Sequence, residues 1–455
     1  MGLVIQGGIV FDPSSNWDGE VRDLFIAHGR VVDHLTEVDE AIDARGLAVT
    51  PAALELRSPV AGYGQNFLRL WGGLPSPREL GESYALLGYT HIHEPDLTLL
   101  TANYVHRELA AIPLMDTSAS LTLNLRDFDI FLKNKENLSE VAAAWAYLLE
   151  HCGGLTLRVA EPFVRYRQEF YQHRTISLEA VLDILDNILH ILDSKISLEA
   201  TPELLTAGLP SSGRFHLACL GPALVNPEAL EKAHRLLAAG VSADMGLLPP
   251  APRSQGSLVP LTIDQDRFAP CDLHGSPDPE APRRALELAL HCRQANLAFS
   301  AADLRQTPVS SFPQLFSWLC DHHSRRRFWG EDLAPCSYSL HDWLRSTRSL
   351  PAQHLGLPDR GHLRPGARAD VSIYDLPTLS WWPQSFNRCR MLLKAGERVV
   401  DNYEIVNHTV SKATFYRRTG ALPNHIIDGL YAKSSFRPGN LRVHPNPEIH
   451  WQKAP

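Results

Sequence analysis

The chain has no long uninterrupted hydrophobic run and no block of charge of one sign. None of its apolar stretches approaches the roughly 18 residues that a membrane-spanning helix needs. Its net charge of −8 is spread over 455 residues, so the electrostatic footprint of nucleic-acid or anionic-membrane binding is missing. We therefore expect neither nucleic acid nor membrane as a partner.

Cysteines are few and isolated. The seven cysteines stand singly at positions 152, 219, 271, 292, 320, 336 and 389, without a C-x-x-C pair. This spacing favours neither a zinc knuckle nor a disulfide framework. The opening MGLVIQGGIVFDP has the pattern of a strand and not that of a charged n-region with an apolar core. We expect a cytoplasmic protein with reduced, mostly buried thiols.

The hydrophobic pattern changes near residue 54. Residues 1–53 consist of short apolar pieces, each closed by Gly, Asp or Pro, which is typical of a small all-β module. Between 54 and 358, strand-like runs such as YTHIHEP, GLTLRVAEP, GRFHLACLG and ANLAFSAAD alternate with helical ones. This alternation predicts an α/β fold in which helices cover a parallel sheet.

Several helices have legible ends. Ser177 is a plausible N-cap for an apolar stripe that ends at Leu192. Asn226 and Pro227 open another helix, which stops at Gly240. A third helix, over residues 139–151, ends before Gly153 and Gly154.

The end of the chain is again rich in strand-like sequence. Residues 359–419 contain the strand-like runs GHLRPGARADVSIYDL and RMLLKAGERVVDNYEIV, so β material brackets the αβ material. Residues 420–455 are rich in Pro, Asn, His and Arg and show little periodicity. We expect an extended tail there, lying on the surface or on a partner.

The motifs at the two ends carry a family resemblance over nearly the whole chain. LVIQGGIVFDP, AHGRVVDHL, IDARGLAVTPAALEL and LGLPDRGHLRPGARADVSIYDL resemble the two ends of an amidohydrolase. YALLGYTHIHEPDL, HRELAAIPLMD and FNRCRMLLKAGERVV resemble the amidohydrolase-like subunit of formylmethanofuran dehydrogenase and its counterpart, the alpha subunit of the bacterial formyltransferase/hydrolase complex. The resemblance implies a distorted (β/α)8 TIM barrel over 54–358, with a β-sandwich made of 1–53 and 359–419.

The resemblance also implies a metal site whose ligands this chain lacks. Active relatives hold two ions with an H-x-H, a carboxylated lysine, two further histidines and an aspartate, because paired ions make hydroxide and polarise the amide. Aligned on the flanks, Arg57 and Pro59 replace the H-x-H, and Arg158 replaces the lysine. An arginine or a proline does not ligate a divalent cation.

Two further ligand positions are incomplete in the same alignment. The next histidine strand keeps His216 but continues with Ala218 and Cys219. The position of the catalytic aspartate falls on Ala302, with Asp303 one residue away and therefore on the other face of a strand. We predict that the chain binds no zinc and has lost the binuclear chemistry.

Two histidine-rich stretches compete with this interpretation. His91 and His93 form a true H-x-H on a predicted second barrel strand, where residues two apart share a face. They are candidates for ligand binding, although packed and hydrogen-bonded barrel histidines are common. The stretch Asp321-His322-His323, followed by Ser-Arg-Arg-Arg, lies at a predicted helix end. It is read as a solvated face or as a contact to an anionic carrier or partner.

Arg57 and Arg158 need partners if they enter the barrel mouth, because a buried guanidinium without one is costly. They either pair with internal carboxylates such as Glu55 or Glu161, or bind a ligand carboxylate in the bidentate way that suits arginine.

The sequence therefore predicts a non-catalytic, amidohydrolase-like subunit of a formyltransferase/hydrolase-type complex in tetrahydromethanopterin-linked one-carbon metabolism. Its expected partners are the other subunits of that complex and an anionic glutamylated carrier. The alternative is a hydrolase that releases formate from an N-formyl carrier with a relocated or mononuclear metal site around His91, His93 and His216.

Overall fold

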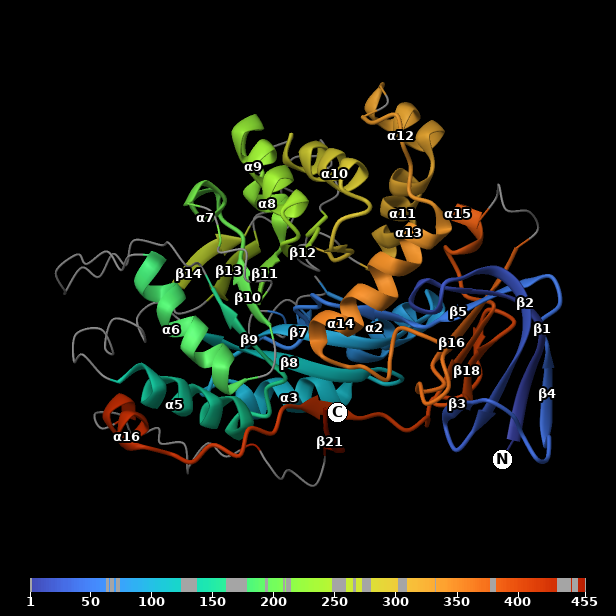
Figure 1. The fold of residues 1–455 in the computed structure, drawn as a ribbon, viewed down its shortest axis with the longest axis horizontal. Coiled ribbons are helices and arrows are strands. Elements are labelled where there is room, and N and C mark those ends of the chain that lie inside the picture. Colours follow the sequence, from blue (N-terminus) through green and yellow to red (C-terminus); the bar gives the residue numbers. More distant parts are fainter. Residues whose placement is uncertain are drawn as a thin grey trace.

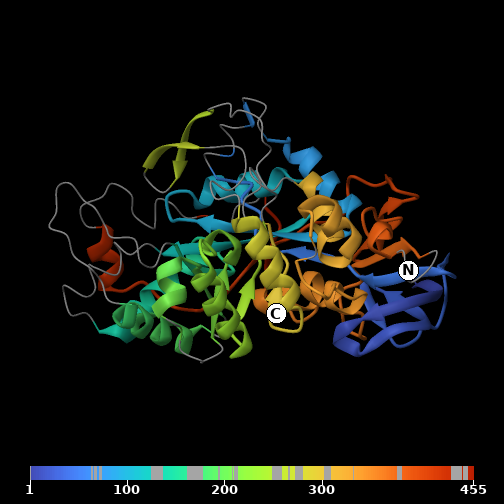
Figure 2. The same cartoon turned by 90° about the horizontal axis from the view of Figure 1, so that it is seen from above.

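The computed structural model describes the backbone of residues 2–62, 65, 69–70, 74–123, 137–160, 178–192, 195–207, 209, 214–247, 259–264, 267–271, 280–301, 309–331, 333–376, 382–431, 443 and 449–454. No helix within these ranges is long and apolar enough to cross a membrane. Two large sheets lie next to each other, one built from both ends of the chain and the other surrounded by helices (Figures 1 and 2).

The first sheet joins the two ends of the chain in nine hydrogen-bonded strands. Their order is β19-β18-β17-β16-β5-β1-β2-β3, and β4 pairs with β1. The seam between the two ends is the antiparallel pairing of β16 with β5. The strands are β1 (Gly2–Asp12), β2 (Trp17–Ala27), β3 (Arg30–Val32), β4 (Glu40–Asp43), β5 (Leu47–Pro51), β16 (Val371–Asp375), β17 (Met391–Lys394), β18 (Glu397–Asp401) and β19 (Glu404–Ile405).

Strand β1 changes partners at its centre. Leu3 to Gln6 pair with β4, whereas Ile9 and Val10 pair with β5. Gly7 lies between the two pairings at a φ of 64°, next to a register shift, because glycine adopts this conformation without a Cβ penalty. The sheet encloses its own apolar core, which includes Leu3, Ile5, Val10, Leu24, Ile26, Val31, Ile42, Val49, Val371, Ile373 and Leu393.

The second sheet contains the parallel strands of the predicted barrel. They pair in chain order, β6-β7-β8-β9-β10-β11-β12-β15. Their bounds are β6 (Ala53–Glu55), β7 (Tyr89–Leu97), β8 (Asp116–Leu123), β9 (Thr156–Val159), β10 (Ile196–Glu199), β11 (Phe215–Ala218), β12 (Ser242–Asp244) and β15 (Leu297–Ala298). A separate antiparallel hairpin joins β13 (Val259–Asp264) to β14 (Arg267–Cys271).

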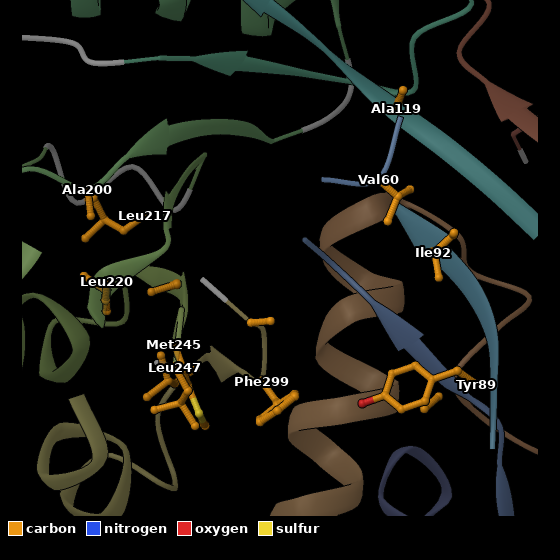
Figure 3. Close-up of a cluster of buried hydrophobic side chains, with 14 of the residues drawn as sticks. Val60, Tyr89, Ile92, Ala119, Ala200, Leu217, Leu220, Met245, Leu247 and Phe299 are labelled. Atoms are coloured by element: carbon orange, nitrogen blue, oxygen red, sulfur yellow. The ribbon is translucent and has the colours of Figure 1, made fainter. Parts of the chain in front are cut away.

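Side chains of the barrel strands alternate between a polar and an apolar face. On β8, Ser118 and Ser120 lie on one face, whereas Ala119 and Leu121 lie on the other. The polar face continues across the sheet through hydrogen bonds between neighbouring strands, as from Ser120 to Thr156 of β9 (2.7 Å). The apolar face packs against the helices in one large core, part of which is shown in Figure 3. The barrel interior is therefore polar and filled.

Helices cover the apolar face and begin largely at the expected residues. Asn226 caps its helix by accepting from the Ala229 amide (2.8 Å), and the predicted helix over 139–151 begins at Leu138. The predicted cap Ser177 lies outside the described residues. The helices here are α2 (Pro77–Leu86), α3 (Ala102–Ala111), α5 (Leu138–His151), α6 (Leu178–Ile191), α7 (Pro202–Ala207), α8 (Leu220–Ala223), α9 (Pro227–Ala238), α10 (Ala281–His291), α11 (Phe312–Cys320), α12 (His322–Trp329) and α15 (Trp382–Ser385), with 3-10 turns η1 (Pro13–Ser15) and η2 (Val309–Ser311).

One interrupted helix lies between the two ends of the barrel sheet. It consists of α13 (Leu340–Leu344), the π-helical segment η3 (Arg345–Ser349) and α14 (Leu350–Leu355), and it contacts both β6 and β15. Pro351 lacks an amide proton and clashes with the preceding turn of a regular α-helix, which accounts for the widened segment before it. The Ser346 carbonyl accepts a hydrogen bond from the Phe299 amide beside β15 (2.8 Å).

The C-terminal tail is more ordered than the sequence predicts. It contains α16 (His425–Tyr431) and β21 (Trp451–Lys453), and β21 pairs in parallel with β20 (Thr414–Tyr416), which pairs with β8. Ile426 and Ile427 are buried in the main core, and the Asn424 side chain donates to the Glu140 carbonyl of α5 (2.8 Å). The prediction of an extended tail was wrong because a seven-residue helix and a three-residue strand are too short to show periodicity.

Candidate functional site

The carboxyl ends of the barrel strands bring charged side chains together at one end of the barrel. Arg57 follows β6, Arg158 lies on β9 and Glu199 ends β10. Parallel strands all end at this edge, where the active sites of (β/α)8 enzymes are built. We call Arg57, Glu199 and Arg158 the mouth triad.

Glu199 binds both arginines of the mouth triad. Its Oε1 accepts from Arg57 Nη2 at 2.9 Å, and its Oε2 accepts from Arg57 Nη1 at 3.4 Å. Oε2 also accepts from Nε of Arg158 at 2.9 Å and from Nη2 of the same guanidinium. The arrangement occupies both carboxylate oxygens and is the bidentate geometry that arginine favours.

The partner of the arginines differs from the two that the sequence suggested. Glu55 accepts only from the Arg57 backbone amide (3.1 Å), and Glu161 lies outside the described residues. Burial alone would raise the pKa of Glu199, but the charges and hydrogen bonds of Arg158 and Arg57 outweigh it and lower the pKa from 4.5 to about 2. Glu199 is therefore a permanent counter-ion at neutral pH.

Glu55 lies fully buried next to the mouth triad. Burial raises its pKa well above 4.5, and the nearby charge of Asp244 acts in the same direction. Its Oε2 has no hydrogen-bond partner among the described residues. A carboxyl group in this position is held neutral and cannot serve as an anionic metal ligand at neutral pH.

His216, the one histidine retained in its predicted strand, is bound on both ring nitrogens. Nδ1 lies 2.9 Å from Ser242 Oγ, and Nε2 lies 3.0 Å from Asp244 Oδ2. The ring stacks on His354 of α14 with centroids 3.6 Å apart. Burial lowers the pKa of His216, although the hydrogen bond to Asp244 opposes this shift.

His91 and His93 meet on one face of β7, as their spacing predicts, and contact the same serine. Nε2 of His91 and Nδ1 of His93 lie 2.8 and 2.7 Å from Ser118 Oγ, and Nε2 of His93 lies 2.7 Å from Ser120 Oγ. Burial lowers the pKa of His93 to about 3, so this ring is neutral. The pair takes part in the hydroxyl network of the barrel interior.

Glu94, which follows this pair, holds the segment after β6 in place. Its Oε2 accepts from the backbone amides of Val60 and Ala61, each at 2.8 Å, and its Oε1 accepts from Asp96 N at 3.2 Å. Burial raises the pKa of Glu94 from 4.5 to about 8. Arg158 reaches the same loop, with Nη1 3.8 Å from Asp96 Oδ1.

The residues at the former ligand positions do not fit a binuclear metal centre. Pro59 is half-buried and offers no side-chain donor, and Ala302 lies outside the described residues. Arg57 and Arg158 bring positive charge, and the His216 ring nitrogens are engaged. Across the described ranges, no three His, Cys, Asp or Glu side chains are grouped as metal ligands.

The sequence did not single out Glu199, Asp244 or His354. Glu199 ends the short run ISLE and Asp244 ends SAD, and both runs are too short for a strong strand pattern. A count along the barrel could have found them, because each is the last residue of a strand on the polar face. His354 gave no signal, since its helix follows the barrel strands in sequence.

Comparisons with known proteins agree with the fold and with the predicted resemblance. Residues 293–400 match the Amidohydrolase family. The FhcA protein of the formyltransferase/hydrolase complex of Methylorubrum extorquens is 27% identical over 491 residues, 88% of this chain and 89% of the relative. Protein FwdA of Methanocaldococcus jannaschii is 22% identical over 507 residues, 89% of each chain.

Solved structures show the same architecture. A chain of the formyltransferase/hydrolase complex FhcABCD from Methylorubrum extorquens, solved with methylofuran, superposes with a TM-score of 0.84 at 22% identity over 100% of both chains. Atrazine chlorohydrolase TrzN from Arthrobacter aurescens, solved with zinc, gives 0.54 at 15% identity over 89% of this chain and 96% of that one. The predicted amidohydrolase-type fold is confirmed.

Proposed function

We propose that this chain is a non-catalytic, amidohydrolase-like subunit of a formyltransferase/hydrolase-type complex in tetrahydromethanopterin-linked one-carbon metabolism. The observation that carries the non-catalytic part is the mouth triad. Two guanidinium groups and one saturated carboxylate occupy the carboxyl ends of β9 and β10 and the residue after β6. Positive charge at this place repels a divalent cation, and a saturated carboxylate has no lone pair directed at one.

Support for the complex comes from the full-length match. The Methylorubrum extorquens chain that this fold follows from end to end is part of an assembly solved with methylofuran. We infer that the partners of this chain are the other subunits of such an assembly. An anionic one-carbon carrier is the corresponding small-molecule partner.

A metal-dependent formamide hydrolase is the competing function. It would need ligands from His91, His93 and His216, whose ring nitrogens contact Ser118, Ser120, Ser242 and Asp244. Each ring would have to leave these partners to bind an ion. The arrangement of the described residues therefore favours the non-catalytic function.

The test combines assembly with metal analysis. The full chain is co-expressed with the formyltransferase-type subunits of its own organism, purified in zinc-containing medium, and analysed for subunit content, metal content and release of formate from an N-formyl carrier. We expect a stable complex in which this chain holds less than stoichiometric metal. Formate release by this chain that scales with its metal content would refute the non-catalytic function. Failure to assemble would refute the role in the complex.

A further inference from the structure

Helices α11 and α12 form an arm that stands away from the barrel, and α12 is its tip (Figure 1). Asp321 caps α12 by accepting from the amides of His323 (3.0 Å) and Ser324 (3.2 Å). Gly330 ends it in the left-handed conformation at a φ of 80°. The tip is thus a short helix with two well-defined ends.

Arg325 fixes the tip to the arm. Its side chain is fully buried, and Nη1 donates to the Trp318 carbonyl at 2.7 Å. Nη2 donates to the Cys336 carbonyl at 2.9 Å and to Ser337 Oγ at 3.1 Å. A guanidinium that binds both sides of the arm keeps α12 in one orientation, so its outer face is preorganised.

The outer face of α12 is cationic. His322 and Arg326 are four residues apart, as are His323 and Arg327, so the four exposed side chains form one stripe. In the described part of the chain, neither Arg326 nor Arg327 forms an ion pair. The stripe contrasts with a chain whose net charge is −8.

Carboxylates near the stripe have other partners. Asp321 is used as the helix cap, and Glu331 binds Arg283 from α10. Asp342 accepts from Ser339 and from Gln294. A counter-charge for Arg326 and Arg327 must therefore come from outside the described residues.

An aromatic side chain lies beside the stripe. Phe328 is 48% exposed, yet its ring is held against Trp318 at 4.6 Å and Trp329 at 5.1 Å between centroids. Arginines next to a rigid aromatic group are the composition of protein-binding hot spots. Two arginines on a helix of eight residues neutralise too few phosphates for strong binding to nucleic acid.

We propose that the stripe of His322, His323, Arg326 and Arg327, together with Phe328, docks on an acidic surface of a companion protein subunit. The partner supplies carboxylates for the two guanidinium groups and an apolar recess for the Phe328 ring. This inference rests on the proposed role in a complex and adds the surface through which the chain is held.

The test compares full-length variants in association with the purified companion subunits. Arg326→Glu with Arg327→Glu is expected to weaken binding at least about tenfold at low salt, because like charges then face each other. Phe328→Ala is expected to weaken it about tenfold through loss of the anchor. Arg78→Glu with Arg235→Glu is the matched control, because these arginines also lie on helices with side chains 71% and 73% exposed. The control should change the Kd less than about twofold.

Salt and alternative probes separate the outcomes. The loss caused by charge reversal should shrink between about 0.05 and 0.3 M salt, and the loss caused by Phe328→Ala should persist. Wild-type assembly with unchanged affinity of both α12 variants overturns this inference and leaves the proposed function standing. Failure of the wild-type chain to assemble overturns both. Binding of a labelled DNA duplex through Arg326 and Arg327, or a homodimer that these variants abolish, overturns it in favour of that occupant. Thermal melts confirm that each variant is folded.

Discussion

The barrel carries a group of arginines and carboxylates at each of its two ends, and the groups differ in burial and in connectivity. At the mouth, Glu199 binds Arg57 and Arg158, with side chains 18%, 13% and 9% exposed. At the opposite end, Asp116 at the start of β8 binds Arg360 at 2.5 Å and Lys394 at 2.8 Å, with all three side chains at most 1% exposed. We call Asp116, Asp370, Arg360, Arg368 and Lys394 the base cluster.

The base cluster connects the two sheets. Asp116 belongs to the barrel strand β8, Lys394 ends β17 of the first sheet, and Arg360 also binds Asp370 at 2.9 Å. Arg368 approaches both carboxylates, at 3.4 and 3.3 Å. The mouth triad, by contrast, connects only neighbouring parts of one sheet. The comparison indicates that the base cluster fixes the position of the domains, whereas the mouth triad fills a site.

The largest effect is expected from Asp116→Asn. Burial opposes ionisation of Asp116, but Lys394, Arg360 and Arg368 outweigh it and hold the pKa below its ordinary value. The substitution leaves three cations with one remaining carboxylate in a sealed site, which should cost about 3 to 5 kcal/mol of unfolding free energy. Urea denaturation measures this loss.

The control for this prediction is Asp375→Asn. Asp375 binds Arg390 at 2.7 Å, but the two side chains are 38% and 39% exposed. Breaking an exposed pair should cost less than about 1 kcal/mol. Equal losses for the two substitutions would mean that burial does not distinguish the base cluster.

A smaller effect is expected from Glu199→Gln at the mouth. The pKa of Glu199 falls from 4.5 to about 2 on folding. A depressed carboxyl pKa stabilises the folded state above the unfolded value, and the contribution is lost as pH falls through the folded value. The glutamine variant should therefore be less stable by about 2 kcal/mol at neutral pH, reduced from a larger nominal value by partial exposure.

The pH dependence identifies the source of this loss. The difference in unfolding free energy between wild type and Glu199→Gln should be constant above about pH 5 and should disappear as pH approaches 2. Denaturant titrations at several pH values provide the measurement. A difference that stays constant down to pH 2 would assign the loss to packing and not to the charge of Glu199.

The sequence predicted the arginines of the mouth triad but not their partner. Arg57 and Arg158 stand out because they replace expected metal ligands between recognisable flanks. Glu199 is an ordinary residue in the run ISLE, and only the pairing of β10 with β9 brings it to Arg158. Local patterns identify residues in anomalous places, whereas contacts between strands depend on register, which one sequence does not determine.

Other parts of the fold show the same division. The strands and most helices follow from periodicity, as at Asn226, where cap and proline coincide. The base cluster was not predicted, because Asp116 and Lys394 are 278 residues apart and both lie in apolar strands. The π-helical segment depends on Pro351 and on the contact of Ser346 with Phe299, and neither is visible as a pattern.

The smallest effect is expected from an attempt to restore metal ligands at the mouth. Arg57→His with Pro59→His recreates the H-x-H of active relatives and removes one guanidinium of the mouth triad. Arg158 keeps its positive charge, Glu199 keeps its bonds to Arg158, and His216 keeps Asp244 and Ser242. A binuclear site needs about six ligands with their own hydrogen-bonded supports, so two histidines should bind no stoichiometric zinc. Elemental analysis and melting curves with and without added zinc, run beside the wild-type chain, should show no difference between the two proteins. A zinc-dependent rise of several degrees in the variant alone would mean that the remaining residues at the mouth still favour a cation, and that Arg57 is the group that excludes it.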